Sequence, residues 1–130
     1  MSVISKAMIL SAAAGSQSAE IYTAERCYIT ELFNSAADAT LSVARARVVP
    51  GVQTQLHSLD VTERYLIEQG EGLLELAGGQ EVPVGVGDSA LIPAGCAQRI
   101  TNVGQVDLLF LCVCTPRFLL EHYTNLEPEE

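Results

Sequence analysis

Three polar side chains in the middle of the chain are candidates for chemistry: His57, Glu63 and Gln98. Each stands near the start of a short apolar run and close to a turn that contains glycine or proline. An imidazole, a carboxylate and an amide can together bind a divalent metal or hydrogen-bond a small ligand. If the three runs are neighbouring strands, their first side chains can meet at the mouth of one barrel, a common place for ligand sites.

Strand alternation decides which neighbours share this pocket, because successive side chains of a strand point to opposite faces. His57 shares a face with Leu59, and Glu63 shares a face with Tyr65. We therefore expect Tyr65 either to line the pocket with its hydroxyl group or to pack in the core.

The elements that must position these residues are short strands. Runs rich in Val, Leu, Ile and Tyr lie between turn signals such as Pro50-Gly51, Gly78-Gly79 and Pro93-Ala94-Gly95. These runs cover residues 27–33, 41–49, 63–68, 73–76, 90–92 and 106–114. Many short strands at regular spacing predict an all-β sandwich or closed barrel. After the break at Pro116, residues 117–123 are expected to form a short C-terminal helix or an extended tail.

The run 106–114 is apolar on both faces, since Leu108 and Phe110 alternate with Leu109 and Leu111. A strand that is buried on both faces suits a barrel wall covered by another layer. In a chain of this size the covering layer could be a second subunit.

Length and charge limit the possible partners. The chain has 130 residues, which fits one domain over residues 1–130, and its net charge is −9 with 16 acidic and 7 basic residues. Binding to phosphates requires clustered Lys and Arg, and Lys6 is the only lysine, so we expect neither nucleic acid nor membrane as a partner. The apolar run at 7–10 is too short for a signal peptide, and we expect an opening strand there.

The four cysteines match no zinc or redox motif, so we expect reduced thiols in a cytoplasmic protein. Cys96 lies near the proposed site and is the candidate for a reactive thiol, with an inert buried thiol as the alternative. The pair Arg45 and Arg47 could clamp an anion or could be ordinary surface residues. We expect Arg99 to point away from Gln98 and His122 to lie on the surface.

The spacing of the candidate residues resembles two sequence motifs of the cupin family. Residues 51–70 follow the pattern G-x5-H-x-H-x3-E-x6-G, with Leu59 in place of the second histidine. Residues 87–102 follow G-x5-P-x-G-x2-H-x3-N, with Gln98 in place of its histidine. The resemblance implies a double-stranded β-helix, or jelly-roll, cupin barrel that commonly forms a homodimer.

The resemblance also implies a metal site with altered ligands. His57 and Glu63 match metal-ligating positions, Gln98 could offer a neutral amide oxygen, and Leu59 can offer nothing. Such a set could still hold Fe, Mn, Ni or Zn as a divalent ion, more weakly than a site with three histidines.

Three functions remain open at this point. The first is a metal-dependent enzyme of the oxygenase or isomerase type, with Glu63 as ligand or general base. The second is a metal-free barrel that binds or senses a small molecule through His57 and Gln98. The third is a metal-free isomerase or epimerase, in which His57 is the base and Tyr65 an acid.

Overall fold

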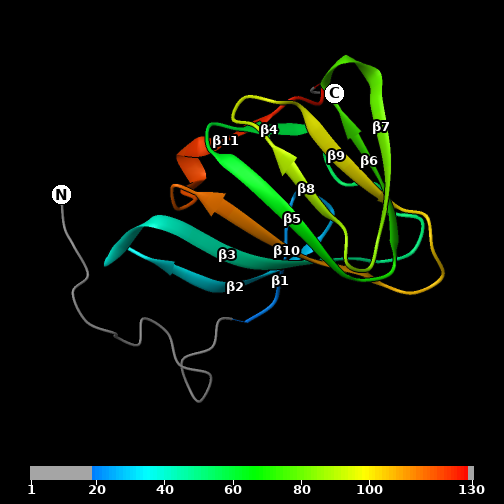
Figure 1. Cartoon of the computed structure of the whole chain (residues 1–130), viewed down its shortest axis with the longest axis horizontal. Coiled ribbons are helices and arrows are strands. Elements are labelled where there is room, and N and C mark those ends of the chain that lie inside the picture. The colour runs from blue at the N-terminus through cyan, green and yellow to red at the C-terminus, as the bar shows by residue number, and fades with distance from the viewer. Residues whose placement is uncertain (1–18, 129–130) are drawn as a thin grey trace.

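The computed structural model describes residues 19–128, which form two antiparallel sheets that pack against each other (Figure 1). The six-stranded sheet has the order β1-β2-β3-β10-β5-β8, and the five-stranded sheet has the order β11-β4-β9-β6-β7. The strands are β1 (Ile21–Tyr22), β2 (Tyr28–Ser35), β3 (Asp38–Val48), β4 (His57–Leu59), β5 (Thr62–Gln69), β6 (Glu71–Leu76), β7 (Gln80–Gly85), β8 (Ser89–Ile92), β9 (Gln98–Asn102), β10 (Leu108–Thr115) and β11 (Tyr123–Asn125).

The all-β prediction is confirmed. The six predicted runs correspond to β2, β3, β5, β6, β8 and β10. The C-terminal segment contains one 3-10 turn, η2 (Leu120–His122), followed by β11, where a longer helix had been one of two expectations. A second 3-10 turn, η1 (Ala77–Gly79), joins β6 to β7. The opening strand expected at 7–10 lies outside the described residues. No helix in residues 19–128 is long and apolar enough to cross a membrane.

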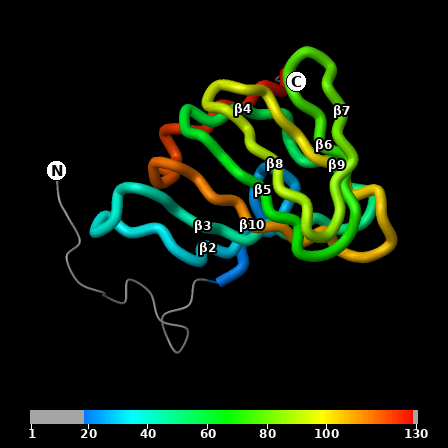
Figure 2. The backbone as a smooth tube through the Cα atoms, viewed as in Figure 1, coloured from blue at the N-terminus to red at the C-terminus, as the bar shows by residue number. Residues whose placement is uncertain are grey.

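Strands that are distant in sequence lie side by side in both sheets (Figure 2). Strand β10 lies between β3 and β5, so that Cys112 is opposite Ala44 on one side and Tyr65 on the other. In the second sheet the short strand β4 lies between β11 and β9, where His57 is opposite Gln98. This pairing brings the two motifs of the sequence together.

The space between the sheets is filled by the inward-facing side chains of both. Val48, Leu74, Ile100 and Leu108 are almost entirely buried there. Burial of an aliphatic side chain of this size stabilises the fold by about 1.5–3 kcal/mol. The core therefore holds the strands that carry the candidate site in fixed register.

Two residues of the sequence motifs have structural roles. Gly70 has a φ of +88°, and a Cβ atom there would lie 3.0 Å from the carbonyl oxygen of Asp107. Asn102 is buried, and its side-chain amide donates hydrogen bonds to the carbonyl groups of Val48 and Val106 at 2.8 and 2.9 Å. Gly70 thus allows the turn after β5 to pack closely against the loop between β9 and β10, and Asn102 ties that loop to the end of β3.

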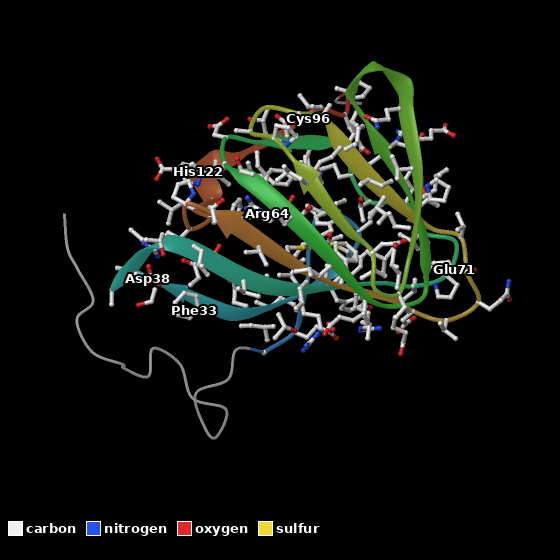
Figure 3. The ribbon with its side chains drawn as sticks, in the orientation of Figure 1. Phe33, Asp38, Arg64, Glu71, Cys96 and His122 are labelled. Atoms are coloured by element: carbon white, nitrogen blue, oxygen red, sulfur yellow. The ribbon has the colours of Figure 1, made fainter. Side chains whose placement is uncertain are left out.

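The outward face of the six-stranded sheet carries apolar side chains from neighbouring strands. Leu111 on β10 is half-buried and lies opposite Leu66 on β5, which is 41% exposed. Leu91 on β8 is also exposed and lies opposite Arg64 of β5, the residue that Figure 3 labels on that strand. The inward face of β10 is largely buried, whereas Leu109, Leu111 and Val113 on its outward face are only half-buried, so the layer expected to cover that face remains a prediction.

Candidate functional site

His57 opens β4 and is 4% exposed. Its Nδ1 atom lies 2.7 Å from the backbone carbonyl oxygen of Gln55. A carbonyl oxygen can only accept a hydrogen bond, so Nδ1 carries the proton and Nε2 of the neutral ring is an acceptor. The ring stacks on Tyr123 of β11 with centroids 4.9 Å apart, and this contact fixes its plane.

Glu63, Gln98 and Tyr65 form a buried chain of hydrogen bonds between the sheets. The Tyr65 hydroxyl donates to Gln98 Oε1 at 2.5 Å, and Gln98 Nε2 donates to Glu63 Oε1 at 3.0 Å. The thiol of Cys114 lies 3.8 Å from Glu63 Oε2. Gln98 is fully buried and uses both ends of its amide within this chain. Its role in this geometry is to orient the Glu63 carboxyl group.

A cavity of about 90 Å³ lies between the sheets in front of these residues. His57, Glu63, Tyr65 and Leu59 line it, whereas Gln98 lies behind the lining. The cavity is smaller than the ~150 Å³ apolar cavity that holds benzene, so it admits only a small group or the end of a larger ligand. The structure therefore brings His57, Glu63 and Tyr65 together at one hollow, and the rest of the lining is mainly apolar.

Glu25 is a member of the site that the sequence did not indicate. It lies in the loop before β2, whose backbone is tied to the loop before β4 by the hydrogen bond from Gln55 N to Glu25 O at 3.0 Å. Its Oε1 atom lies 3.7 Å from His57 Nε2. Glu25 belongs to no motif and no strand, so its position depends on long-range packing that a local pattern does not report.

Burial changes the protonation of the site. Desolvation raises the pKa of both Glu25 and Glu63 to about 7. Desolvation lowers the pKa of His57, which keeps the ring neutral at pH 7. Burial raises the pKa of Tyr65 well above its usual value, so that this hydroxyl group keeps its proton. The site thus combines two carboxyl groups that gain or lose a proton near pH 7 with an uncharged imidazole ring.

The donor set does not fit the metal that the family usually holds. Leu59 occupies the position of a histidine ligand, and the amide oxygen of Gln98 already accepts a hydrogen bond from Tyr65. One oxygen of Glu63 accepts from Gln98 as well. In residues 19–128 no group of three or more His, Cys, Asp and Glu side chains is placed to hold a metal ion.

The cysteines at the cavity are not the one that the sequence placed near the site, Cys96. Cys27, Cys112 and Cys114 line the cavity, and all four thiols are free. Burial raises the pKa of Cys27 and Cys114 to about 12, which leaves them as inert thiols. Cys96 lies in the loop before β9 and does not line the cavity (Figure 3).

The basic residues considered in the sequence lie away from the cavity. Arg45 pairs with Glu68 at 2.8 Å, and Arg47 pairs with Glu20 and Asp107. Arg99 pairs with Glu75 at 2.8 Å and does not line the cavity with His57. His122 is half-buried in the turn η2, where Nδ1 accepts a hydrogen bond from the backbone of Leu119 (Figure 3). In this geometry Arg45 and Arg47 do not form an anion clamp.

Two antiparallel sheets with a polar cluster at the cavity between them define a small β-barrel with a candidate ligand site. The model of the cupin domain family matches residues 44–114, and the chain belongs to the cupin family. This match includes both motifs, and the variant positions Leu59 and Gln98 fall within it.

Known proteins resemble the chain to different degrees. It is 36% identical over 87 residues to an uncharacterized protein of Methanocaldococcus jannaschii, covering 66% of this chain and 69% of that protein. It is 37% identical over 71 residues to an oxalate-binding protein of Thermotoga maritima, covering 54% of this chain and 58% of that protein. A double-stranded β-helix protein of Klebsiella pneumoniae has a TM-score of 0.69 at 16% identity, covering 82% and 89%. The fold is therefore a double-stranded β-helix.

Proposed function

We propose that this cupin binds a small molecule in the cavity between its sheets, with His57 and Glu63 as the polar contacts and no metal between them. The observation that carries the proposal is the state of His57. Its ring is fixed on both sides by Gln55 and Tyr123, while Nε2 has no hydrogen bond to the described residues and belongs to a cavity-lining side chain. An acceptor that is held in place on a cavity-lining side chain and left open is suited to a donor on a ligand.

The same geometry supports the metal-free alternative over the metal-dependent one. Gln98, the third candidate ligand, is used to orient Glu63, and a metal bound to its oxygen would break the hydrogen bond from Tyr65. His57 and Glu63 alone are fewer than the three protein ligands of ordinary catalytic metal sites. The expectation of bound Fe, Mn, Ni or Zn therefore receives no support from the donor set.

Nitrogen NMR of the two histidines tests the proposal directly. In chelator-treated protein labelled with ¹⁵N, we expect His57 to show the Nδ1–H tautomer with an unprotonated Nε2. A panel of small fragments should include binders that shift the Nε2 signal of His57 and leave His122 unchanged. If the Nε2 signal responds to Zn²⁺ or Mn²⁺ and to no fragment, the proposal is wrong.

A second candidate function is acid–base catalysis on the bound molecule. The specific observation is that Glu25 and Glu63, both with a pKa near 7, line the cavity that also exposes His57 Nε2. A general acid or base works best when its pKa lies near the operating pH. Tyr65 is less suited to donate a proton, because its hydroxyl group is bonded to Gln98 and its pKa is high. A rate that peaks near neutrality and is lost in Glu63→Gln would support this candidate.

The chain is further proposed to form a homodimer through the outward face of its six-stranded sheet. Leu66, Leu91 and the half-buried side chains of β10 place apolar side chains on this face beside Arg45 and Arg64. Light scattering should give twice the chain mass for the wild type and the monomer mass for Leu66→Glu. The substitution Val86→Glu, at an exposed loop valine after β7, is the matched control and should leave the dimer intact. A monomeric wild type would overturn the proposal.

A further inference from the structure

When Glu25 is ionised, two hydrogen-bond acceptors face each other at the site without a donor between them. Nε2 of the neutral His57 ring is an acceptor, because Nδ1 donates its hydrogen to Gln55 O. Oε1 of Glu25 lies 3.7 Å away, which is too long for a hydrogen bond. Neither atom has a hydrogen bond to another group in residues 19–128. When Glu25 is ionised, a molecule that brings two or more N–H or O–H donors to this point satisfies both acceptors.

The cavity continues outward into a larger hollow of about 690 Å³. The two hollows adjoin each other, because the same residues line both: Glu25, Ile29, Glu31, Phe118 and Tyr123. The outer hollow is mainly apolar, and Ile21 and Leu120 contribute to its wall. A ligand whose polar end reaches Glu25 and His57 can therefore leave an apolar body in the outer hollow.

The charge of the lining selects against anions. Glu25, Glu31 and Glu63 line the two hollows, and no Lys or Arg of residues 19–128 does so. The six arginines of this part of the chain instead have hydrogen-bond partners elsewhere: Arg26 with Glu127, Arg45 with Glu68, Arg47 with Glu20, Arg64 with Thr115, Arg99 with Glu75 and Arg117 with Asn34. Above about pH 7, where Glu25 and Glu63 are ionised, an anion entering the cavity would lose water and meet carboxylates with no compensating cation.

We infer that the ligand is a small ammonium compound with an apolar body, whose N–H groups bridge His57 Nε2 and Glu25 Oε1. An ammonium group has three donors and no acceptor, which matches the two facing acceptors and the acidic lining. The rings of Tyr123 and Phe118, which line both hollows, offer further contacts that favour a cation. The inference rests on the proposed function, and it separates this chain from a relative whose name refers to the dianion oxalate.

Calorimetry with three probes of equal chain length tests the inference. The probes are n-hexylammonium, 1-hexanol and hexanoate, which differ in the charge of one end group. At about pH 8.5, where Glu25 is ionised and the ammonium group keeps its proton, the charge-assisted hydrogen bond should make hexylammonium bind about tenfold or more tightly than hexanol. Hexanoate should give no measurable binding.

Two variants test whether Glu25 causes the tighter binding of hexylammonium. Glu25→Gln keeps the shape of the side chain and removes its charge, so it should remove the advantage of hexylammonium and leave the affinity for hexanol within about twofold. Glu81→Gln removes the same charge from an exposed position on β7, outside both hollows, and should change neither affinity. Near-ultraviolet circular dichroism confirms that both variants are folded.

The outcomes separate this inference from the proposed function. Equal or tighter binding of hexanol or hexanoate, lost in His57→Ala, overturns the ammonium ligand and leaves a small-molecule site at His57 in place. No binding of any probe also overturns the inference. The proposed function itself fails if, in metal-free protein, the Nε2 signal of His57 responds to no fragment.

Discussion

At the scale of single residues, the exchange of histidine for glutamine at position 98 changes what this part of the site does. Gln98 passes a hydrogen bond from Tyr65 to Glu63 and is itself fully buried. The sequence indicated that His57, Glu63 and Gln98 lie near one another, because the motif spacing reports backbone positions. It did not indicate that Gln98 lies behind the cavity, since that depends on hydrogen bonds between two sheets.

Gln98→Leu should destabilise the protein. The substitution leaves the Tyr65 hydroxyl group and one oxygen of Glu63 buried without partners, and each unsatisfied group costs about 1–3 kcal/mol. We expect a loss of about 2–4 kcal/mol in the free energy of unfolding, measured by urea denaturation. Gln80→Leu, at an exposed position on β7, is the matched control and should cost little. Equal stability of the two variants would contradict the role of Gln98.

The change of protein stability with pH should reveal the raised pKa of Glu63. Its pKa is about 7 in the folded state and 4.5 in a model peptide, so the folded state binds more protons between these values. Stability is therefore highest below pH 4.5 for this group and falls as the pH rises to about 7, by on the order of 3 kcal/mol. The lowered pKa of His57 acts in the opposite direction below pH 6.5.

Glu63→Gln isolates this contribution. Because glutamine does not titrate, the free energy of unfolding of the variant relative to the wild type should increase as the pH rises from 4.5 to 7. Denaturation curves at half-unit pH steps measure the difference, and Glu81→Gln provides the reference curve. A difference between Glu63→Gln and wild type that stays constant with pH would show that Glu63 ionises normally.

At the scale of elements, the strands predicted from the sequence are those whose residues form an apolar run between two turn signals. Strand β7 was not predicted, because it contains Glu81 and Pro83. It lies at the edge of the five-stranded sheet, where a proline does not interrupt pairing on both sides. Strand β11 was also not predicted, since its three residues become a strand only by pairing with β4.

The turn between β5 and β6 should depend on Gly70. Alanine at this position has an unfavourable positive φ and also places Cβ 3.0 Å from the backbone oxygen of Asp107. Gly78 has a φ of +82° but open space around its missing Cβ, so Gly78→Ala carries the backbone cost alone. We expect Gly70→Ala to lower the free energy of unfolding by about 1–3 kcal/mol more than Gly78→Ala. Equal losses by thermal or urea denaturation would show that the contact with Asp107 relaxes.

At the scale of the whole molecule, the double-stranded β-helix encloses a cavity between its two sheets. Most of the cavity lining is apolar, its charged side chains are glutamates, and no arginine of residues 19–128 lines it. The overall negative charge of the chain was evident in its sequence, but its relation to the cavity was not. A cupin whose polar cluster has lost two histidines still retains one oriented imidazole, His57, in front of a cavity. In the proposed function, the fold supplies a binding site that does not require a metal.

The most direct measurement is the melting temperature of chelator-treated protein with small fragments, before and after addition of Fe²⁺, Mn²⁺, Ni²⁺ or Zn²⁺. A ligand at ten times its Kd stabilises by about 1.4 kcal/mol, which corresponds to a shift of roughly 3–6 °C for a domain of this size. We predict such shifts in the absence of metal and their loss in His57→Ala. Shifts that appear only after a metal is added would contradict metal-free binding at His57.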